Sequence, residues 1–318
     1  MPGELKPPII LIGNTRSGAT MVQKVMATHP DVVGWYEPGG LWLYADPGRS
    51  HDEFGADDAT DRVKQYIRKQ FLKYQKQNGN CVVFEKTPQN ILRIPYVRAI
   101  FPEATYLFIV RNPFSFISSV EFKWQRTVTG KGILRRLKST PIIHLHYYAS
   151  RYIVQQYSKR ILRRKYLKIW GPRYKGIHED LETQDQLTVI ARQWAVCSEK
   201  AEQDMAIFDD GEVLRLRYED FVEDPIADLE RICAHCGLQL TGNLVSAAKE
   251  WVKADRQEKW RRFDPHDLAR ILPEIHAEMQ RHGYEIPAEI AQAAAELQEA
   301  VGDPVLHLDR LTDPGQLV

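Results

Sequence analysis

The sequence predicts an α/β protein with three layers, in which helices flank a central, mostly parallel sheet. Short apolar segments alternate with amphipathic segments along most of the 318 residues. Residues 105–110 form an unbroken apolar run, which is typical of strands buried on both faces of a parallel sheet. Residues 9–12 form another apolar run, which leads directly into a glycine-bracketed turn and a helical stretch. This alternation predicts one domain spanning residues 1–318.

Each expected element has a local pattern. Strands are expected at residues 9–12, 31–36, 81–84, 105–110 and 213–218, where apolar residues form a run or alternate. Helices are expected at residues 21–26, 61–77, 89–101, 185–201 and 285–300, where apolar residues recur every three or four positions. Pro113 stands where it can open a helix after the fourth strand.

The composition is that of an ordinary globular protein, with a net charge of +1 and four cysteines. No apolar run approaches the ~20 residues that span a bilayer, and the N-terminus lacks a signal segment. We therefore expect a cytoplasmic protein, or a soluble part of a longer one.

Cys233 and Cys236 have the spacing of a redox or metal pair, but no second pair completes four ligands. Their amphipathic surroundings, which end at Gly237, predict buried thiols in a helix.

The first turn has the pattern of a phosphate-binding loop. Gly13 and Gly18 are separated by four residues, between an expected strand and an expected helix. In such a turn the backbone N–H groups and the helix N-terminus face an anion. Ala19 stands where loops that bind nucleoside triphosphates have lysine, and the cation of this loop is Arg16. The alternative is a glycine pair that serves turn geometry alone, which the strand–turn–helix context disfavours.

The fourth expected strand ends in a cation instead of an acid. A kinase or hydrolase with a phosphate loop needs an acidic residue at the end of another strand to hold magnesium. Here residues 105–110 are followed by Arg111. A guanidinium at the carboxyl end of a strand can bind a phosphate group bidentately. A loop without lysine and a strand without aspartate together favour a nucleotide that carries an additional phosphate.

Four motifs resemble those of the sulfotransferases that use 3′-phosphoadenosine 5′-phosphosulfate (PAPS), and they follow one another along the chain in the same order as in that family. They fall within residues 9–38, 81–120 and 213–262. The resemblance implies a fold like that of P-loop proteins, with PAPS as donor, 3′-phosphoadenosine 5′-phosphate (PAP) as product and no metal required. Residues 122–178 remain as a variable basic insertion that we expect to contribute to the acceptor site, and residues 263–318 as a helical C-terminal extension.

The resemblance also implies a set of donor-binding residues. Residues 15–20 look like the family's 5′-phosphosulfate loop, Arg111 with Ser119 like its 3′-phosphate motif, and Tyr218 like a tyrosine near the adenine. Residues 256–261 are more loosely similar to a basic loop that closes over the nucleotide. The implied residues are Thr15, Arg16, Ser17, Gly18, Ala19, Thr20, Arg111, Ser119, Tyr218, Arg256, Lys259 and Trp260.

Two residues are candidates for the chemistry. Glu37 follows the second expected strand and resembles the Glu-Pro step of carbohydrate-acting members, which implies a general base whose pKa partial desolvation can raise. Its alternative is a solvated turn carboxylate. Lys86 follows the third strand and matches the lysine that stabilises the bridging oxygen. Pro88 stands where the phenol and steroid branch has a catalytic histidine, which shifts the role of base to Glu37. Glu85 is a reserve base, although we expect it to pair with the neighbouring Lys86 ammonium.

A strongly basic segment lies between the second and third motif regions. Residues 122–178 contain fifteen Lys or Arg and no Asp or Glu, whereas a solvated helix face usually mixes both signs. These cations either contact a polyanion or an anionic membrane surface, to which the protein would be peripheral, or pair with acids elsewhere in the chain. Nucleic acid is not expected, because no recognised binding motif accompanies the charge. Residues 171–176 form a turn with phosphate-binding potential.

The sequence therefore predicts a PAPS-dependent sulfotransferase. The acceptor would be a hydroxyl, less readily an amine, of a carbohydrate, a glycolipid or another small hydroxyl compound. In-line displacement would use Glu37 as general base and Lys86 as electrostatic clamp. Two alternatives stay open: a phosphate-loop nucleotide kinase, which Ala19 and Arg111 disfavour, and a non-catalytic nucleotide- or anion-binding protein.

Overall fold

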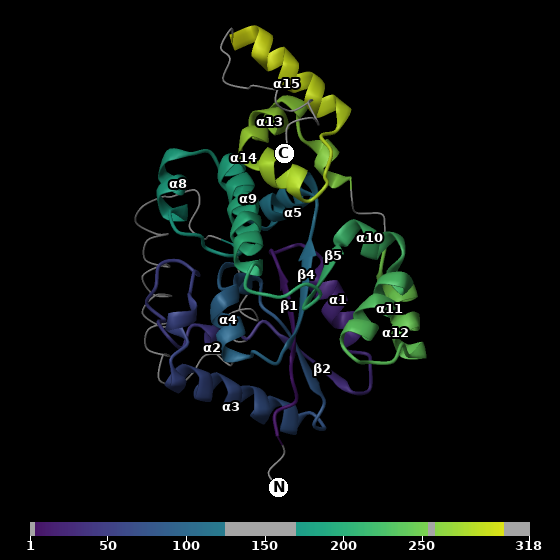
Figure 1. The fold of residues 1–318 in the computed structure, drawn as a ribbon. Coiled ribbons are helices and arrows are strands. Elements are labelled where there is room, and N and C mark those ends of the chain that lie inside the picture. Colours follow the sequence, from purple (N-terminus) through teal and green to yellow (C-terminus); the bar gives the residue numbers. More distant parts are fainter. Residues whose placement is uncertain (1–3, 125–169, 254–257, 302–318) are drawn as a thin grey trace.

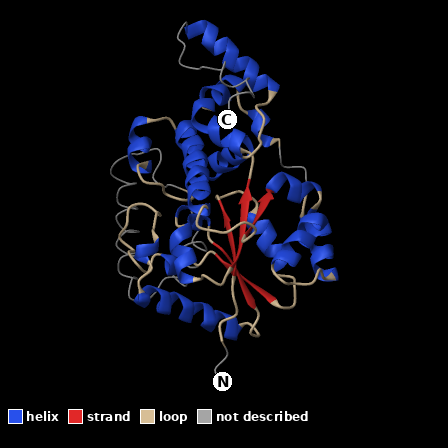
Figure 2. Ribbon diagram, in the orientation of Figure 1, coloured by secondary structure: helices blue, strands red, loops and turns tan. Residues whose placement is uncertain are grey.

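The fold is built on a parallel sheet. The computed structural model describes residues 4–124, 170–253 and 258–301. Five strands in these ranges pair in the order β2-β3-β1-β4-β5, and each pair is parallel. They are β1 (Ile9–Gly13), β2 (Val32–Tyr36), β3 (Val82–Lys86), β4 (Thr105–Val110) and β5 (Val213–Arg217). Figures 1 and 2 show them as a twisted fan between helices. The predicted α/β class with a central parallel sheet is confirmed.

Helices surround this sheet. The α-helices are α1 (Ala19–Met26), α2 (Gly39–Trp42), α3 (Asp61–Gln77), α4 (Ile94–Ile100), α5 (Pro113–Trp124), α8 (Ile177–Thr183), α9 (Gln186–Met205), α10 (Tyr218–Glu223), α11 (Pro225–His235), α12 (Gly242–Trp251), α13 (Pro265–Arg270), α14 (Leu272–Arg281) and α15 (Ala288–Val301). Short 3₁₀ helices are η1 (Ala56–Asp58), η2 (Pro88–Leu92) and η4 (Lys259–Arg262).

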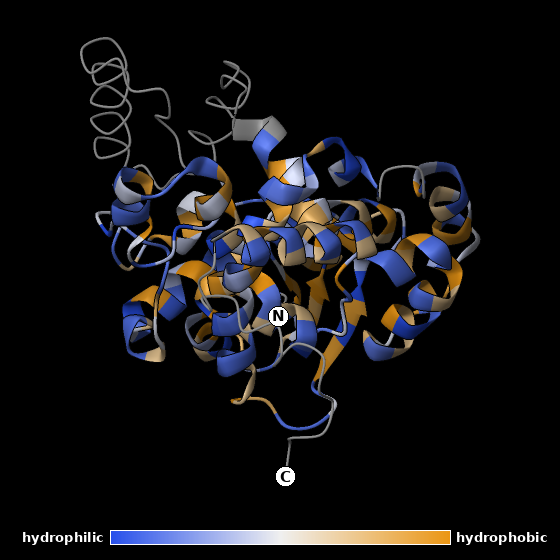
Figure 3. Cartoon of the chain, turned by 90° about the horizontal axis from the view of Figure 1, so that it is seen from above, coloured by the Kyte–Doolittle hydropathy of each residue, from blue (hydrophilic) through white to orange (hydrophobic). Residues whose placement is uncertain are grey.

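Alternate side chains of β1 belong to two different cores. Ile10 and Ile12 pack with residues of α2, α3, α4 and α9. Ile9 and Leu11 pack on the opposite face, with residues of α1, α11 and α12. All four are buried because successive side chains of a strand point to opposite faces of the sheet. Figure 3 shows hydrophobic strands at the centre, between helices that carry both hydrophobic and hydrophilic residues.

A third core joins the C-terminal helices to the rest of the molecule. It contains residues of α5 and α9 together with η4, α13, α14 and α15. In Figure 1 these last three helices lie at the end of the molecule opposite the N-terminus. The third core therefore fixes α5, the helix that follows β4, against the C-terminal part of the chain.

Proline and asparagine set the helix boundaries near the site. The Asn112 Oδ1 accepts the backbone N–H groups of Phe114 and Ser115, and Pro113 is the first residue of α5, as expected from the sequence. The continuous helix expected at residues 89–101 is wrong, since η2 and α4 are separate elements. Pro95 explains the break, because its ring would clash with a carbonyl one turn earlier in a continuous helix.

The four cysteines are free. Cys233 is buried in α11, whereas Cys236, which follows this helix, is half-buried. Within the described ranges, no group of three or more His, Cys, Asp or Glu residues is arranged to hold a metal ion. No helix in these ranges is both long and apolar enough to cross a bilayer.

Candidate functional site

The carboxyl ends of the five strands each lead to one of the predicted site residues. Arg16 lies in the turn after β1, Glu37 follows β2, Lys86 ends β3, Arg111 follows β4 and Tyr218 follows β5. Because the strands are parallel, these ends share one edge of the sheet, which is where open α/β sheets bind ligands. The sheet also has a topological switch point at β1, because β3 lies on one side of this strand and β4 on the other.

The turn between β1 and α1 has the shape of an anion-binding loop. Gly18 adopts a left-handed backbone with φ of 91°, and a Cβ there would lie 2.1 Å from the Tyr218 ring, so only glycine fits. Arg16 has φ of 60°, a strained conformation for a residue with a side chain. The Ser17 Oγ is buried and has no hydrogen-bond partner among the described residues. The loop thus offers a buried hydroxyl and the first N–H groups of α1 at one place.

Arg111 is a buried cation beside this loop. Its Nη1 donates to the Arg16 carbonyl at 2.9 Å, and its guanidinium lies 4.2 Å from the centroid of the Tyr218 ring. Its Nε is buried without a hydrogen-bond partner, and no described carboxylate forms an ion pair with it. Burial lowers the pKa of Arg111 from its ordinary value. A buried guanidinium with an unused donor is suited to an anionic ligand.

Side chains distant in sequence connect the loop to the helix after β4. The Arg16 Nε donates to the Ser119 Oγ at 2.6 Å, which joins the loop to α5. The Trp194 Nε1, from α9, donates to the Arg111 carbonyl at 3.0 Å. The structure therefore brings together Arg16, Arg111, Ser119 and Tyr218, which the sequence predicted as one donor site.

Glu37 and Lys86 form an ion pair at the other end of this sheet edge. The Lys86 Nζ lies 2.7 Å from the Glu37 Oε1. Their proximity follows from strand register, because Tyr36 pairs with Lys86 in the β2–β3 ladder and Glu37 is the next residue. Lys86 is only 2% exposed, and its ammonium lies 4.7 Å from the centroid of the Tyr36 ring. Glu37 has a left-handed backbone with φ of 48°, so both turns that bear candidate residues hold a strained non-glycine residue.

Glu85 does not pair with Lys86, which corrects the expectation from the sequence. It is fully buried, and its carboxylate accepts hydrogen bonds from Trp42, Thr87 and Asn90. Burial raises the pKa of Glu85 to about 7, against the lowering effect of the hydrogen bonds from Thr87 and Trp42. A carboxyl enclosed in this way has no open face toward an acceptor molecule.

Comparison with known proteins identifies the family. A family model described as "Sulfotransferase family" matches residues 7–170 and 158–242. The chain belongs to the sulfotransferase family. Its fold is similar to the sulfotransferase domain from the Synechococcus PCC 7002 olefin synthase, with 14% identity, a TM-score of 0.50 and coverage of 95% of this chain and 97% of that one. It is also similar to sulfotransferase STF9 from Mycobacterium avium, with 12% identity, a TM-score of 0.50 and coverage of 89% and 79%.

A curated relative shares a shorter region with this sulfotransferase. Nodulation protein NoeE from Sinorhizobium fredii (strain NBRC 101917 / NGR234) is 24% identical over 129 residues. The match covers 36% of this chain and 31% of that protein. This sulfotransferase therefore spans about a third of the length of the relative.

Two of the C-terminal candidates of this sulfotransferase, Lys259 and Trp260, belong to η4, which packs against α5. Trp260 is buried in the third core, with its ring 5.7 Å from that of Phe114, whereas Lys259 is exposed. Arg262, which sequence reasoning missed, donates to the Ser118 carbonyl and pairs with Glu121. Arg256 lies outside the described residues. The segment is thus packed beside Ser119, and a direct contact of Lys259 or Trp260 with a nucleotide stays a prediction.

The turn at residues 171–176 contacts the phosphate loop. A Cβ on Gly171, whose φ is 100°, would lie 2.9 Å from the Thr15 Cγ2. The fully buried Gln193 holds this turn, because its Nε2 donates to the carbonyls of Trp170 and Pro172. The Asn14 Nδ2 in turn donates to the Gln193 carbonyl at 3.5 Å. Sequence reasoning could not find this contact, since the turn and the loop are far apart in the chain.

The described end of the basic segment pairs with acids of the chain. Arg173 forms a buried ion pair with Asp52 at 2.7 Å, and the Lys175 backbone N–H donates to Glu53. For Arg173 the internal-pairing alternative is confirmed. Most of the segment, residues 125–169, lies outside the described residues, as does the expected contact with an anionic surface.

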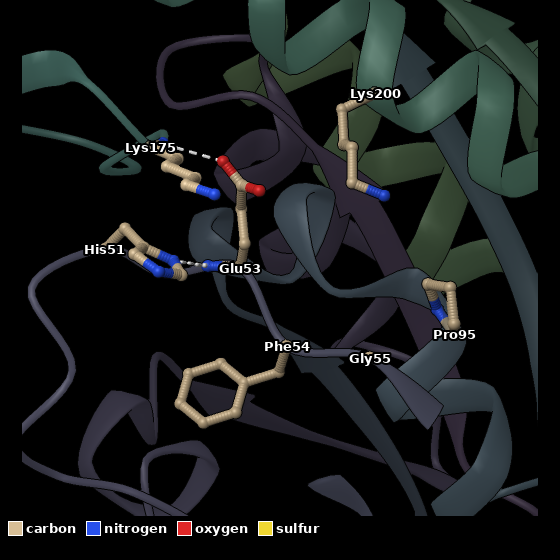
Figure 4. Close-up of a pocket in the computed structure, with 7 residues that line it drawn as sticks. All are labelled: His51, Glu53, Phe54, Gly55, Pro95, Lys175 and Lys200. Carbon is tan, nitrogen blue, oxygen red and sulfur yellow. Dashed lines mark hydrogen bonds between the residues drawn. The ribbon is translucent and has the colours of Figure 1, made fainter. Parts of the chain in front are cut away.

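A pocket of about 260 Å³ has none of the predicted site residues in its lining (Figure 4). It is lined by His51, Glu53, Phe54, Gly55, Pro95, Lys175 and Lys200. The Glu53 carboxylate accepts the backbone N–H of Lys175, and the Lys200 ammonium pairs with Asp204. Of the two lysine charges, that of Lys200 is therefore already compensated.

Proposed function

We propose that this sulfotransferase transfers the sulfuryl group of PAPS to a hydroxyl, less readily an amine, of a small acceptor. The observation that carries the proposal is the convergence, on one sheet edge, of a lysine-free phosphate loop, a buried guanidinium without an ion pair, and a buried lysine paired with a glutamate. A nucleoside triphosphate with magnesium does not need this arrangement, whereas a nucleotide with phosphate groups on both the 3′ and 5′ sides does.

The donor half of the proposal rests on unused hydrogen-bond donors. The buried Ser17 Oγ and Arg111 Nε have no partner among the described residues, so two anionic groups of one nucleotide could satisfy them. Residues 15–20 are assigned to the 5′-phosphosulfate, and Arg111 with Ser119 to the 3′-phosphate. Tyr218 is assigned to the adenine side, since its ring already covers Gly18 and Arg111.

The catalytic half assigns one role to each member of the ion pair. When bound, PAPS supplies an electrophilic sulfur and a phosphate leaving group. Glu37 takes the proton of the acceptor hydroxyl as the new S–O bond forms on the side opposite the leaving oxygen. Lys86 stabilises the negative charge on the bridging oxygen as the old S–O bond breaks, and PAP is released. The two side chains are 2.7 Å apart, so the proposed base and the proposed cation act at one place.

The acceptor is proposed to be a carbohydrate or a glycolipid. Support comes from the Glu-Pro step at Glu37 and from the absence of the histidine that the phenol and steroid branch carries at the position of Pro88. Tyr36 is 38% exposed beside Lys86, so an aromatic face is available next to the proposed base. Aromatic rings of this kind offer apolar contact area to a partly polar ligand.

Two measurements test the proposal. Isothermal titration calorimetry should detect tighter binding of PAP than of ATP with magnesium, and the reverse order would support the kinase alternative instead. PAPS turnover, followed as PAP release over a panel of sugars, glycolipids, phenols and amines, should then select a sugar hydroxyl. Binding of PAP with no turnover on any class of acceptor would support a non-catalytic nucleotide-binding protein.

A further inference from the structure

The two residues of the proposed catalytic pair differ in how firmly their own strands hold them. Lys86 is the last residue of β3, which pairs with strands on both sides. Glu37 follows β2, which lies at the end of the described sheet and pairs there with β3 alone. Glu37 also has the strained φ of 48°, and the Pro-Gly-Gly sequence follows it. A strained residue at a sheet edge keeps its conformation only if the surrounding structure enforces it.

A hydrogen bond between buried side chains supplies this restraint. Trp42, at the end of α2 and five residues after Glu37, is fully buried, and its Nε1 donates to the Glu85 Oε1 at 3.0 Å. Glu85 directly precedes Lys86. The bond therefore connects the segment that follows Glu37 to the residue before Lys86, across two strands.

The same carboxylate also holds the chain on the other side of Lys86. Glu85 accepts hydrogen bonds from the Thr87 hydroxyl and from the Asn90 Nδ2 at 3.0 Å. The Trp42 ring is itself enclosed by aromatic rings, with centroids of Phe71 at 5.8 Å and Phe101 at 6.1 Å. The Glu85 carboxylate thus joins the segment after Glu37 and the segment after Lys86 to the aromatic core around Trp42.

We propose that Trp42 and Glu85 are positioning residues that set the distance between Glu37 and Lys86, and thereby the turnover rate. This inference rests on the proposed function of the pair. Neither residue contacts the phosphate loop in any bond described above, so donor binding does not depend on them. A displacement of about 1 Å at a reacting group can cost ~100-fold in rate.

The key variant is Trp42→Phe, which keeps an aromatic ring in the core and removes the N–H donor. We expect kcat to fall by about 10- to 100-fold while the KM for PAPS stays within about twofold. Tyr106→Phe is the matched control, because it removes another buried hydrogen bond of the same core, from the Tyr106 hydroxyl to the Phe101 carbonyl at 2.8 Å. It should lower the melting temperature and leave kcat and KM unchanged.

A second control removes a tryptophan hydrogen bond near the proposed PAPS site. Trp194→Phe removes the hydrogen bond to the Arg111 carbonyl, so we expect it to raise the KM for PAPS more than it lowers kcat. Opposite responses of the two tryptophan variants would separate positioning of the pair from general loss of packing. If Trp42→Phe lowers stability but keeps the wild-type kcat, Trp42 has only a structural role and the inference is wrong.

A readout without turnover tests the same inference independently. The rate at which acetic anhydride acetylates Lys86, measured by peptide mass spectrometry, should rise several-fold in Trp42→Phe and in Glu37→Gln, because both loosen the ion pair. It should not change in Tyr106→Phe. Unchanged acetylation in Trp42→Phe, with faster acetylation in Glu37→Gln, would overturn the positioning role alone. Wild-type turnover in Glu37→Gln would instead contradict the proposed base.

Discussion

On the β1–β4 side of the candidate site, the buried Arg111 guanidinium has no ion pair with a described residue. On the β2–β3 side, the ammonium of Lys86, which is also buried, lies 2.7 Å from the Glu37 carboxylate. Removing a cation from water is costly unless an opposite charge compensates it. Binding of an anion would therefore compensate the charge of Arg111 on the first side. The Glu37–Lys86 pair on the second side is already neutral, so Glu37 can take up a proton and Lys86 can interact with a new negative charge. We therefore expect the first side to serve donor binding and the second to serve the chemistry.

The largest expected effect comes from the paired side. Glu37→Gln should lower kcat by ~10²–10⁴ because it removes the proposed base, and Lys86→Ala by ~10²–10³ because it removes the charge opposite the leaving oxygen. PAP affinity of Glu37→Gln should remain close to that of the wild type in calorimetry. Arg68→Ala, which removes the Arg68–Glu103 pair on α3, is the control and should leave kcat unchanged. Wild-type turnover in Glu37→Gln would place the base elsewhere.

Arg111→Ala tests the unpaired side. Loss of a charge-assisted contact in a partly buried site costs ~2–5 kcal/mol, so PAP should bind at least ten times more weakly. Arg111→Lys keeps the charge but loses the planar fork, and we expect an intermediate affinity. Both are measured by calorimetry with PAP. If Arg111→Ala lowers kcat at saturating PAPS while PAP binds as in the wild type, the division between the two sides is wrong.

Gly171→Ala should have a smaller effect, on the donor side only. The new Cβ would lie 2.9 Å from the Thr15 Cγ2 and push against the phosphate loop, so we expect the KM for PAPS to rise by about three- to tenfold. Gly176→Ala is a matched control, because its φ of 99° imposes the same backbone strain but its Cβ meets nothing within 4 Å. Equal KM values in the two variants would show that the turn does not support the loop.

Glu85→Gln should have the smallest effect on turnover, because it keeps an oxygen that can accept the Trp42 N–H. Its main effect should be on the free energy of unfolding. Burial raises the folded-state pKa of Glu85 from 4.5 to about 7, although Arg93 and Lys86 act in the opposite direction. The wild type should therefore lose stability as the pH rises from 4.5 to 7, because the unfolded carboxyl is ionised in this window while the folded one still holds its proton. Urea unfolding of both proteins should show a difference that grows in favour of Glu85→Gln by at most ~3 kcal/mol over this window. A difference independent of pH would mean that Glu85 does not titrate there.

Much of the candidate site could be predicted from the sequence because its members follow strands. Each member ends a strand or lies within three residues of its end: Arg16, Glu37, Lys86, Arg111 and Tyr218. Parallel strands bring such residues to one edge whatever the details of packing. Of the two wrong predictions, the continuous helix at residues 89–101 overlooked the local effect of Pro95, whereas the expected Glu85–Lys86 pair depended on where side chains point. The Glu85 carboxylate points into the core while its neighbour Lys86 points to Glu37, since adjacent residues of a strand face opposite sides.

The sequence by itself determined the parallel α/β sheet, the helix after Pro113 and the loop from Gly13 to Gly18, because each depends on local periodicity and turn chemistry. Only the tertiary structure decided which of these residues meet. The β2–β3 register brings Glu37 to Lys86, and helix packing brings Ser119 to Arg16 and Gly171 to Thr15. These contacts join residues from 49 to 156 positions apart. No local pattern encodes such pairs, because they arise from how the layers pack around one sheet.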